Sequence, residues 1–107
     1  MQTIIRATAY QQLDKAIEQG EQMFGTAVAT KFYNRFMEFV RRLSTNPQSG
    51  FPEPLLAGRQ REYRSLMVNE HFKLVYYYDK KKDTLYIVDL WDTRREPASL
   101  SKRIRGK

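Results

Sequence analysis

The hydrophobic positions in the first half of the chain recur every three or four residues, which is the period of a helix. After a short β-leaning segment at residues 2–7, a first stripe begins beyond Thr8 and contains Leu13, Ala16, Ile17, Gly20 and Phe24. A second, more continuous stripe contains Val28, Phe32, Phe36, Phe39, Val40 and Leu43, and mostly polar residues lie on the opposite side of that helix. Asn46-Pro47 ends the second helix, because proline disfavours helical backbone in the residue before it.

The junction between the two predicted helices is only one or two residues long. Gly25 is typical of the residue that follows a helix, and Thr26 is typical of the N-cap of the next one. Helices joined this closely form an antiparallel hairpin. Its apolar stripes predict packing against the rest of the chain rather than a ligand site.

The second half of the chain has the alternating pattern of strands. Residues 46–62 hold three prolines and two glycines, which predicts an irregular loop. Strands are then predicted at residues 63–69, 72–79 and 84–91, joined by short turns that favour an antiparallel meander. The predicted order is β-α-α-β-β-β, a single α+β domain over residues 1–107 with the helical hairpin on one face of a small, mainly antiparallel sheet.

Composition excludes several classes of protein. The chain has 107 residues, no cysteine and one histidine, His71. The lack of cysteine excludes a disulfide scaffold, a cysteine nucleophile and a cysteine-ligated metal, and it suits a reducing compartment. With one histidine, no metal site and no cofactor are expected. No segment approaches the roughly 20 apolar residues that span a bilayer, and no signal peptide is evident at the N-terminus, so a cytoplasmic protein without membrane contact is predicted.

Charge adds a second constraint. The net charge is +7 at pH 7, from 19 Lys and Arg against 12 Asp and Glu. This surplus favours a polyanionic partner such as nucleic acid, a nucleoprotein or an acidic protein. The alternative interpretation is that the basic residues only solubilise the surface.

Alternation along the strands predicts a basic patch on the sheet. Phe72, Leu74 and Tyr76 form an apolar set that should meet the helices, which leaves Lys73 and Tyr77 on the opposite face. The predicted patch on this open face contains Arg64, Lys73, Tyr77, Arg94 and Arg95.

Such a patch has the chemistry of a target-binding or nucleic-acid-binding site. Arginine matches a phosphate or carboxylate with two parallel hydrogen bonds, lysine adds a point charge, and Tyr77 is available to stack on a base. The alternative is that these are ordinary solvated side chains, with Arg95 paired to Asp92 or Glu96.

The chain resembles the ParE/RelE superfamily of type II toxin–antitoxin toxins over nearly its whole length. The resemblance rests on the order of its segments: the strand and helical hairpin, Asn46-Pro47-x-x-Gly50, Tyr63-Arg64-x-Leu66, Phe72-Lys73-Leu74-Val75-Tyr76, and Trp91-Asp92-Thr93-Arg94-Arg95-Glu96-Pro97. It implies a toxin of a plasmid-stabilisation-type module that inhibits growth, and a cognate antitoxin as its partner in a hetero-oligomer.

Two activities are described in this superfamily. ParE-like members are described as poisons of DNA gyrase without an enzymatic step, and RelE-like members as ribosome-dependent mRNA endonucleases. In the nuclease pattern, Arg64, Lys73 and Arg94 (or Arg95) would be the catalytic cations. Leu66, however, stands where those enzymes have a second lysine, and the tyrosine expected six residues after the arginine is replaced by Leu100 or Ser101.

The resemblance therefore favours the gyrase-binding activity, with metal-independent mRNA cleavage as the alternative. A third possibility is a member that binds its antitoxin and no longer poisons a target. The antitoxin is expected to supply acidic and apolar residues to the helices or the open sheet face. The basic tail, residues 99–107, either frames that contact or is a solvated, frayed end.

Overall fold

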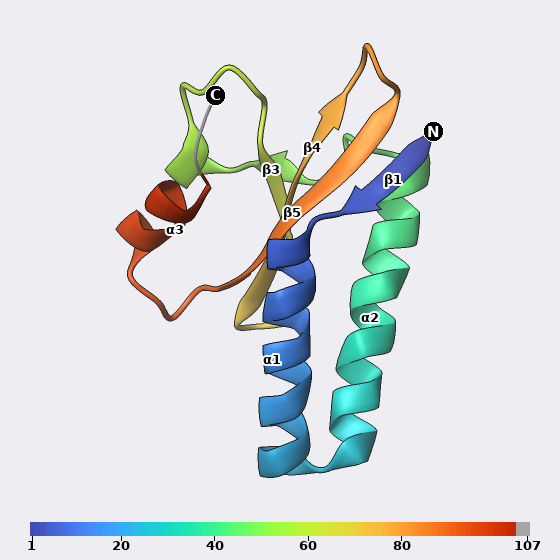
Figure 1. Cartoon of the computed structure of the whole chain (residues 1–107), viewed down its shortest axis with the longest axis vertical. Helices are drawn as coiled ribbons and strands as arrows, with labels where there is room; N and C mark the ends of the chain where they lie inside the picture. Colours follow the sequence, from blue (N-terminus) through green and yellow to red (C-terminus); the bar gives the residue numbers. More distant parts are fainter. Residues whose placement is uncertain (105–107) are drawn as a thin grey trace.

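The computed structural model describes residues 1–104 as an open sheet of five strands with three α-helices and one short 3-10 helix (Figure 1). The sheet order is β1-β5-β4-β3-β2. The elements are β1 (Gln2–Ile5), α1 (Ala7–Phe24), α2 (Thr26–Thr45), β2 (Phe51–Pro52), η1 (Pro54–Leu56), β3 (Arg64–Met67), β4 (Phe72–Asp79), β5 (Thr84–Asp92) and α3 (Pro97–Arg103). The predicted α+β class, the hairpin and the antiparallel meander of β3, β4 and β5 are confirmed.

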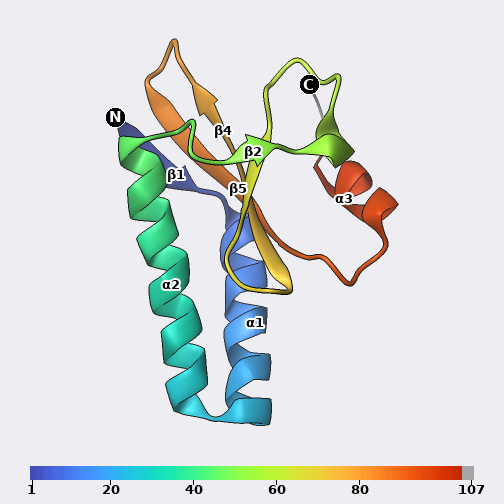
Figure 2. The same cartoon turned by 180° about the vertical axis from the view of Figure 1, so that it is seen from behind.

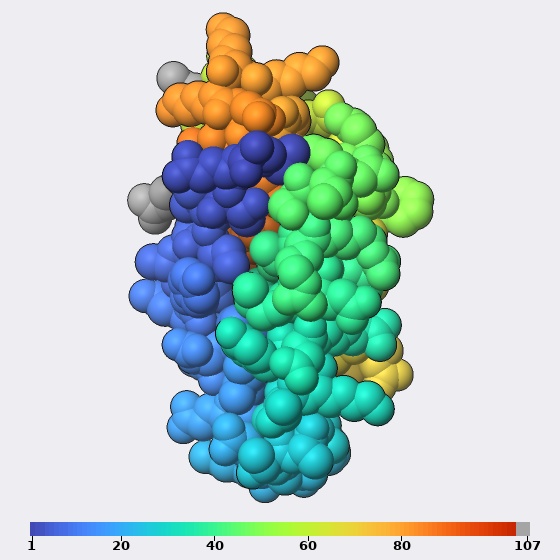
Figure 3. All heavy atoms as spheres, turned by 90° about the vertical axis from the view of Figure 1, so that its right-hand side faces the viewer, coloured from blue at the N-terminus to red at the C-terminus, as the bar shows by residue number. Residues whose placement is uncertain are grey.

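The two long helices are joined by the single residue Gly25. Its φ of 91° lies in the left-handed region that glycine adopts without strain, and its N–H donates to the carbonyl of Glu21 at 3.0 Å. Gly25 is also the N-cap of α2, so the expected capping role of Thr26 is wrong: Thr26 is the first residue of that helix. Figure 3 shows α1 and α2 lying side by side down to a tip that extends past the sheet.

The hairpin covers one face of the sheet with an aliphatic and aromatic core. Its centre is Phe36, which is completely buried together with residues of both helices and of β4 and β5. The principal members are Ala9, Leu13, Phe36, Leu43, Leu74, Tyr76, Leu85, Ile87 and Leu90. The stripes predicted for both helices therefore supply core residues, and Phe72, Leu74 and Tyr76 face the helices as predicted.

The first strand, β1, pairs in parallel with β5, the last strand in the sequence. Gln2 lies opposite Thr84 and Ile5 lies opposite Ile87. β4 and β5 pair along their length in antiparallel register, with an irregularity at Val75/Tyr76. The segment predicted as an irregular loop contains the two-residue strand β2, which extends the sheet beyond β3.

The other face of the sheet is also covered, so the prediction of an open face is wrong. η1, the segment leading to β3 and the helix α3 pack on it, as the view from behind shows (Figure 2). The second core that they form contains Leu56, Tyr63, Val75, Tyr77, Val88, Trp91, Leu100 and Ile104. The sequence analysis missed α3: the tail predicted at residues 99–107 begins inside this helix, and residues 105–107 lie outside the described residues.

Within residues 1–104, none of the helices combines the length and the apolar character that crossing a membrane requires.

Candidate functional site

The five residues of the predicted basic patch do not share one surface. Tyr77 is 3% exposed and belongs to the second core, between Tyr63 and Tyr86. Its ring stacks on Tyr86 with centroids 4.9 Å apart and meets the edge of Tyr63 at 5.4 Å. A buried ring cannot stack on a base from outside, so that part of the prediction is wrong.

Lys73 lies on the same face as Tyr77, as predicted, but it has a buried partner. Its ammonium group forms an ion pair with the carboxylate of Glu53, which is 2% exposed. The Glu53 carboxylate also accepts hydrogen bonds from the hydroxyl of Ser65 at 3.0 Å and from the backbone N–H of Leu55 at 2.9 Å. Lys73 thus neutralises a buried acid and anchors the start of η1 to the sheet.

Arg64 is on the opposite face from the one predicted. Its Cα partner in the register is Tyr76, so its side chain leaves the sheet on the helix side. The guanidinium donates to the carbonyl of Gly50 at 2.8 Å and to Glu62 at 2.7 Å. The N–H of Gly50 in turn donates to the hydroxyl of Tyr76 at 2.9 Å, and a Cβ at Gly50 would lie only 2.5 Å from that oxygen, so the close approach requires glycine.

The two adjacent arginines after β5 diverge. Arg94 turns back onto Asp92, with two side-chain hydrogen bonds of 3.0 and 2.9 Å that hold the pKa of that carboxyl below its ordinary value. Arg95 places its guanidinium 5.0 Å from the centre of the Trp91 ring, in the second core. Both side chains belong to exposed residues, and they remain the accessible members of the predicted set.

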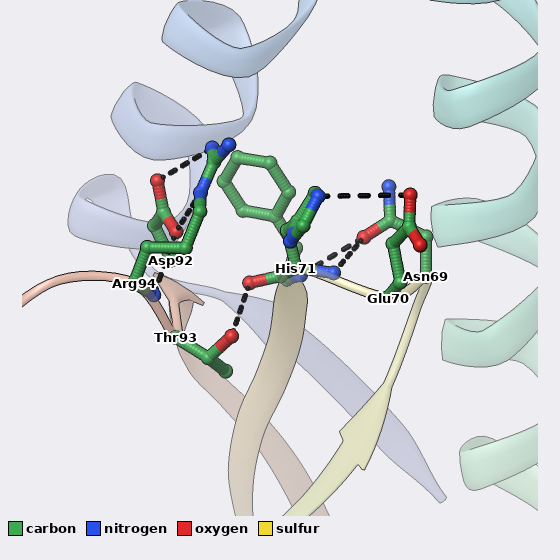
Figure 4. Close-up of polar contacts among 7 residues, drawn as sticks. Asn69, Glu70, His71, Asp92, Thr93 and Arg94 are labelled. Atoms are coloured by element: carbon green, nitrogen blue, oxygen red, sulfur yellow. Dashed lines mark hydrogen bonds and ion pairs between the residues drawn. The ribbon is translucent and has the colours of Figure 1, made fainter.

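The close-up in Figure 4 shows how the end of β5 is attached to the turn before β4. The backbone N–H and the hydroxyl of Thr93 both donate to the carbonyl of His71, at 2.7 and 2.9 Å. The side-chain oxygen of Asn69 accepts from the N–H groups of His71 and Phe72, both at 2.9 Å. These bonds fix the position of Arg94 beside the turn.

A groove lies between this turn and the free end of the hairpin. It has a volume of about 410 Å³ and is lined by α1, α2, residues 69–72 and Arg94. Three of its apolar side chains are largely solvent-exposed: Met23 at 72%, Phe24 at 66% and Val28 at 48%. Periodicity placed Phe24 and Val28 in the core stripes, and the exposure arises because the hairpin extends past the sheet that would bury them.

Among residues 1–104, no group of three or more His, Asp and Glu side chains is placed to hold a metal ion. His71 is half-buried in a turn, and its Nε2 lies 3.6 Å from Glu70. The three conditional nuclease residues are separated: Arg64 is on the helix side, Lys73 is under η1, and Arg94 is at the groove.

A helical hairpin on one face of a β1-β5-β4-β3-β2 sheet, with a short helix on the other face, is the fold of RelE/ParE-like toxins. A family model described as "ParE toxin of type II toxin-antitoxin system, parDE" matches residues 4–97. The chain therefore belongs to the ParE toxin family of type II toxin–antitoxin systems.

Solved structures agree with this assignment at the level of the fold. A chain of the chromosomal ParDE system from P. aeruginosa has a TM-score of 0.69 and 17% identity, over 86% of this chain and 95% of that one. The YoeB/ParE toxin from Agrobacterium tumefaciens has a TM-score of 0.61 and 16% identity, over 86% and 98%. The archaeal RelE-RelB complex from Pyrococcus horikoshii has a TM-score of 0.50 and 14% identity, over 89% and 97%. No curated protein matches the sequence at a significant level.

Proposed function

We propose that this toxin arrests growth in the cytoplasm by binding DNA gyrase rather than by cleaving RNA. The observation that carries the proposal is the match of the ParE family model to residues 4–97. The separation of Arg64, Lys73 and Arg94 supports it, because general acid–base cleavage needs groups that converge on one phosphate and one hydroxyl. Arg94 and Arg95 are the proposed target contacts, since they are the exposed members of the predicted set.

Two purified systems test this proposal against the nuclease alternative. Gyrase supercoiling should be inhibited by the toxin, while mRNA on translating ribosomes should remain intact. Cleaved mRNA together with unaffected supercoiling would reverse the assignment. A toxin that does neither, but still binds its antitoxin, would belong to the third class, of members that have lost their poisoning activity.

A pair of double variants tests whether growth arrest depends on Arg94 and Arg95 themselves or only on the net charge of the protein. Arg94→Ala with Arg95→Ala should abolish growth arrest and leave the fold intact, because both residues are exposed. Lys81→Ala with Lys82→Ala removes the same charge from the exposed turn between β4 and β5 and should leave growth arrest unchanged. Equal loss in both double variants would show that net charge, and not these arginines, matters.

We further propose that the hairpin groove receives an apolar and acidic segment of the antitoxin. Met23, Phe24 and Val28 offer the apolar surface, Arg94 lies at the same groove, and a chain of charge +7 favours an acidic partner. Phe24→Asp should release the toxin from neutralisation by a co-expressed antitoxin. Phe51→Asp is the matched control, because Phe51 is similarly exposed, at 73% against 66% for Phe24, but lies on β2.

A further inference from the structure

Two arginines meet at one phenol oxygen on the second face of the sheet. Arg6 lies between β1 and α1 and donates to the hydroxyl of Tyr77 at 2.8 Å. Arg61, in the segment before β3, donates to the same oxygen at 2.6 Å. Two hydrogen bonds to one atom bring the guanidinium groups close enough for a single tetrahedral oxyanion to bridge them.

Neither cation has a carboxylate partner among the described residues. Three other arginines on this face are differently engaged: Arg103 pairs with Asp89, and Arg59 donates to carbonyl oxygens of Ser101 and Ile104. Arg95 lies over the Trp91 ring. Burial raises the pKa of the Tyr77 hydroxyl in spite of the two arginines, so at neutral pH the phenol keeps its proton and does not supply the missing negative charge. Two cations around a neutral oxygen favour the arrival of an anion.

The aromatic floor beneath the arginines holds them in place. The Arg6 guanidinium lies 5.1 Å from the centre of the Tyr86 ring and 5.6 Å from that of Tyr77, and Arg61 lies 4.5 Å from the centre of Tyr77. Tyr77 itself is buried and stacked on Tyr86, so the floor is rigid. Arginines positioned before the ligand arrives lose less conformational entropy on binding.

The start of α1 adds to the positive potential. Arg6 is the N-cap of this helix of 18 residues, no side chain caps it, and no acidic residue lies in its first turn. The partial positive charge at a helix N-terminus therefore stays uncompensated beside the two guanidinium groups.

We propose that Arg6 and Arg61, held on the floor formed by Tyr77 and Tyr86, are a binding site for a phosphate group of a nucleic-acid backbone. Nucleic acid is favoured over an acidic peptide because fixed guanidinium forks, an uncapped helix start and a net charge of +7 act together on a chain of regularly spaced phosphates. The site contains neither Arg94 nor the hairpin groove, and it goes beyond the proposed gyrase activity.

Binding of a short single-stranded thymidine oligonucleotide, followed by fluorescence anisotropy without gyrase, tests the site directly. Arg6→Gln with Arg61→Gln should weaken binding about tenfold at low salt and reduce the slope of log K against log[salt] by about 0.7, the value for one neutralised phosphate of a single strand. Arg6→Lys with Arg61→Lys should also weaken binding, because lysine keeps the charge but loses the fork.

Arg35→Gln with Arg41→Gln is the charge-matched control. Both arginines are exposed on α2, which covers the opposite face of the sheet, so this variant should bind the oligonucleotide as the parent chain does. Equal weakening in the two glutamine pairs, or full binding by the lysine pair, would show diffuse attraction and overturn the proposal.

Two further outcomes are decisive. Binding of an oligoglutamate peptide would overturn the proposal in favour of an acidic protein if it is tighter than that of the oligonucleotide and is abolished by the same Arg6 and Arg61 variants. In the unmodified chain, titration with the oligonucleotide should shift the side-chain Nε–H signals of Arg6 and Arg61 in NMR spectra; signals that stay in place would refute the site even if the variants fail to fold. Inhibition of gyrase supercoiling is measured in a separate assay, so a negative result for oligonucleotide binding does not contradict the gyrase proposal.

Discussion

The two faces of the sheet are built on different physical principles. The helix face is covered by an apolar hairpin around Phe36, and its buried members are almost all aliphatic or aromatic carbon. The second face carries Tyr63, Tyr77 and Trp91, and arginines lie over these rings while Asp89 and Glu53 are buried beside them. Burial of carbon stabilises the first face, whereas the second also depends on the pairing of charges removed from water.

The largest effect is expected from a cavity on the helix face. Phe36→Ala should lower the free energy of unfolding by about 3–5 kcal/mol, because Phe36 is completely buried between the hairpin and the sheet. Chemical denaturation measures this change. Tyr33→Ala, on the exposed side of the same helix, is the control and should cost about 0.5 kcal/mol or less; similar costs at the two positions would contradict the packing.

On the second face, leaving a buried charge unpaired should lower the free energy of unfolding more than the loss of apolar packing does. Arg103→Met leaves the Asp89 carboxylate, which is completely buried, without its cation, and should cost about 3 kcal/mol. Adding Asp89→Leu should recover most of that loss, since a buried pair can be replaced by apolar side chains. If the double variant is no more stable than Arg103→Met, the loss comes from packing and not from charge.

Tyr76 and Tyr77 are neighbours on β4 but face opposite sides of the sheet, so removing the hydroxyl oxygen of each compares the two faces. Tyr76→Phe removes the acceptor of the Gly50 N–H and the donor to the Pro47 carbonyl, so a buried N–H is left unpaired and the expected cost is about 2 kcal/mol. Tyr77→Phe should cost about 1 kcal/mol, because Arg6 and Arg61 belong to exposed residues and regain water. Thermal unfolding of both variants measures the difference, and the reverse order would show that the arginines hold the second face together.

The contributions of Asp89 and Asp92 to the free energy of unfolding should change with pH in opposite directions. Burial raises the pKa of Asp89 above its ordinary value of 3.8, so its contribution to stability declines as pH rises through the folded pKa. The hydrogen bonds from Arg94 lower the pKa of Asp92, so its contribution is present above 3.8 and is lost as pH falls through the folded pKa.

Unfolding free energies of the parent chain, Asp89→Asn and Asp92→Asn, measured from about pH 2 to about pH 7, check both directions. The parent chain should lose stability relative to Asp89→Asn as pH rises. It should lose stability relative to Asp92→Asn as pH falls. Parallel curves for the two variants would contradict the assigned environments.

Periodicity predicted the helix face well because that face obeys one rule, the burial of apolar side chains at helical and strand spacing. Phe36, Leu43, Leu74 and Tyr76 were all placed correctly for that reason. Phe24 and Val28 show the limit of the rule: their spacing is correct for a core, but the hairpin is longer than the sheet beneath it.

The second face could not be predicted in the same way because its order comes from contacts between distant polar groups. Alternation placed Lys73 and Tyr77 on the correct side, but no local pattern indicates that Glu53 pairs with Lys73 or that Arg6 reaches Tyr77. Alternation groups Arg64 with Leu66, and the face expected for Arg64 was the wrong one, because Leu66 lies opposite Leu74 on the helix side. A sign of α3 was present in Pro97, which suits the first turn of a helix, followed by Leu100 and Ile104 one turn apart.

The parallel pairing of β1 with β5 has a consequence for the order of folding. Gln2 and Thr84 are neighbours in the sheet but are 82 positions apart in the sequence, so joining them closes most of the polypeptide into one loop. Contacts of such high sequence separation form slowly, and β1 should be the last strand to dock. Arg6 follows β1 directly, so its meeting with Arg61 waits for that closure, and a nascent or partly unfolded chain would present the two arginines separately.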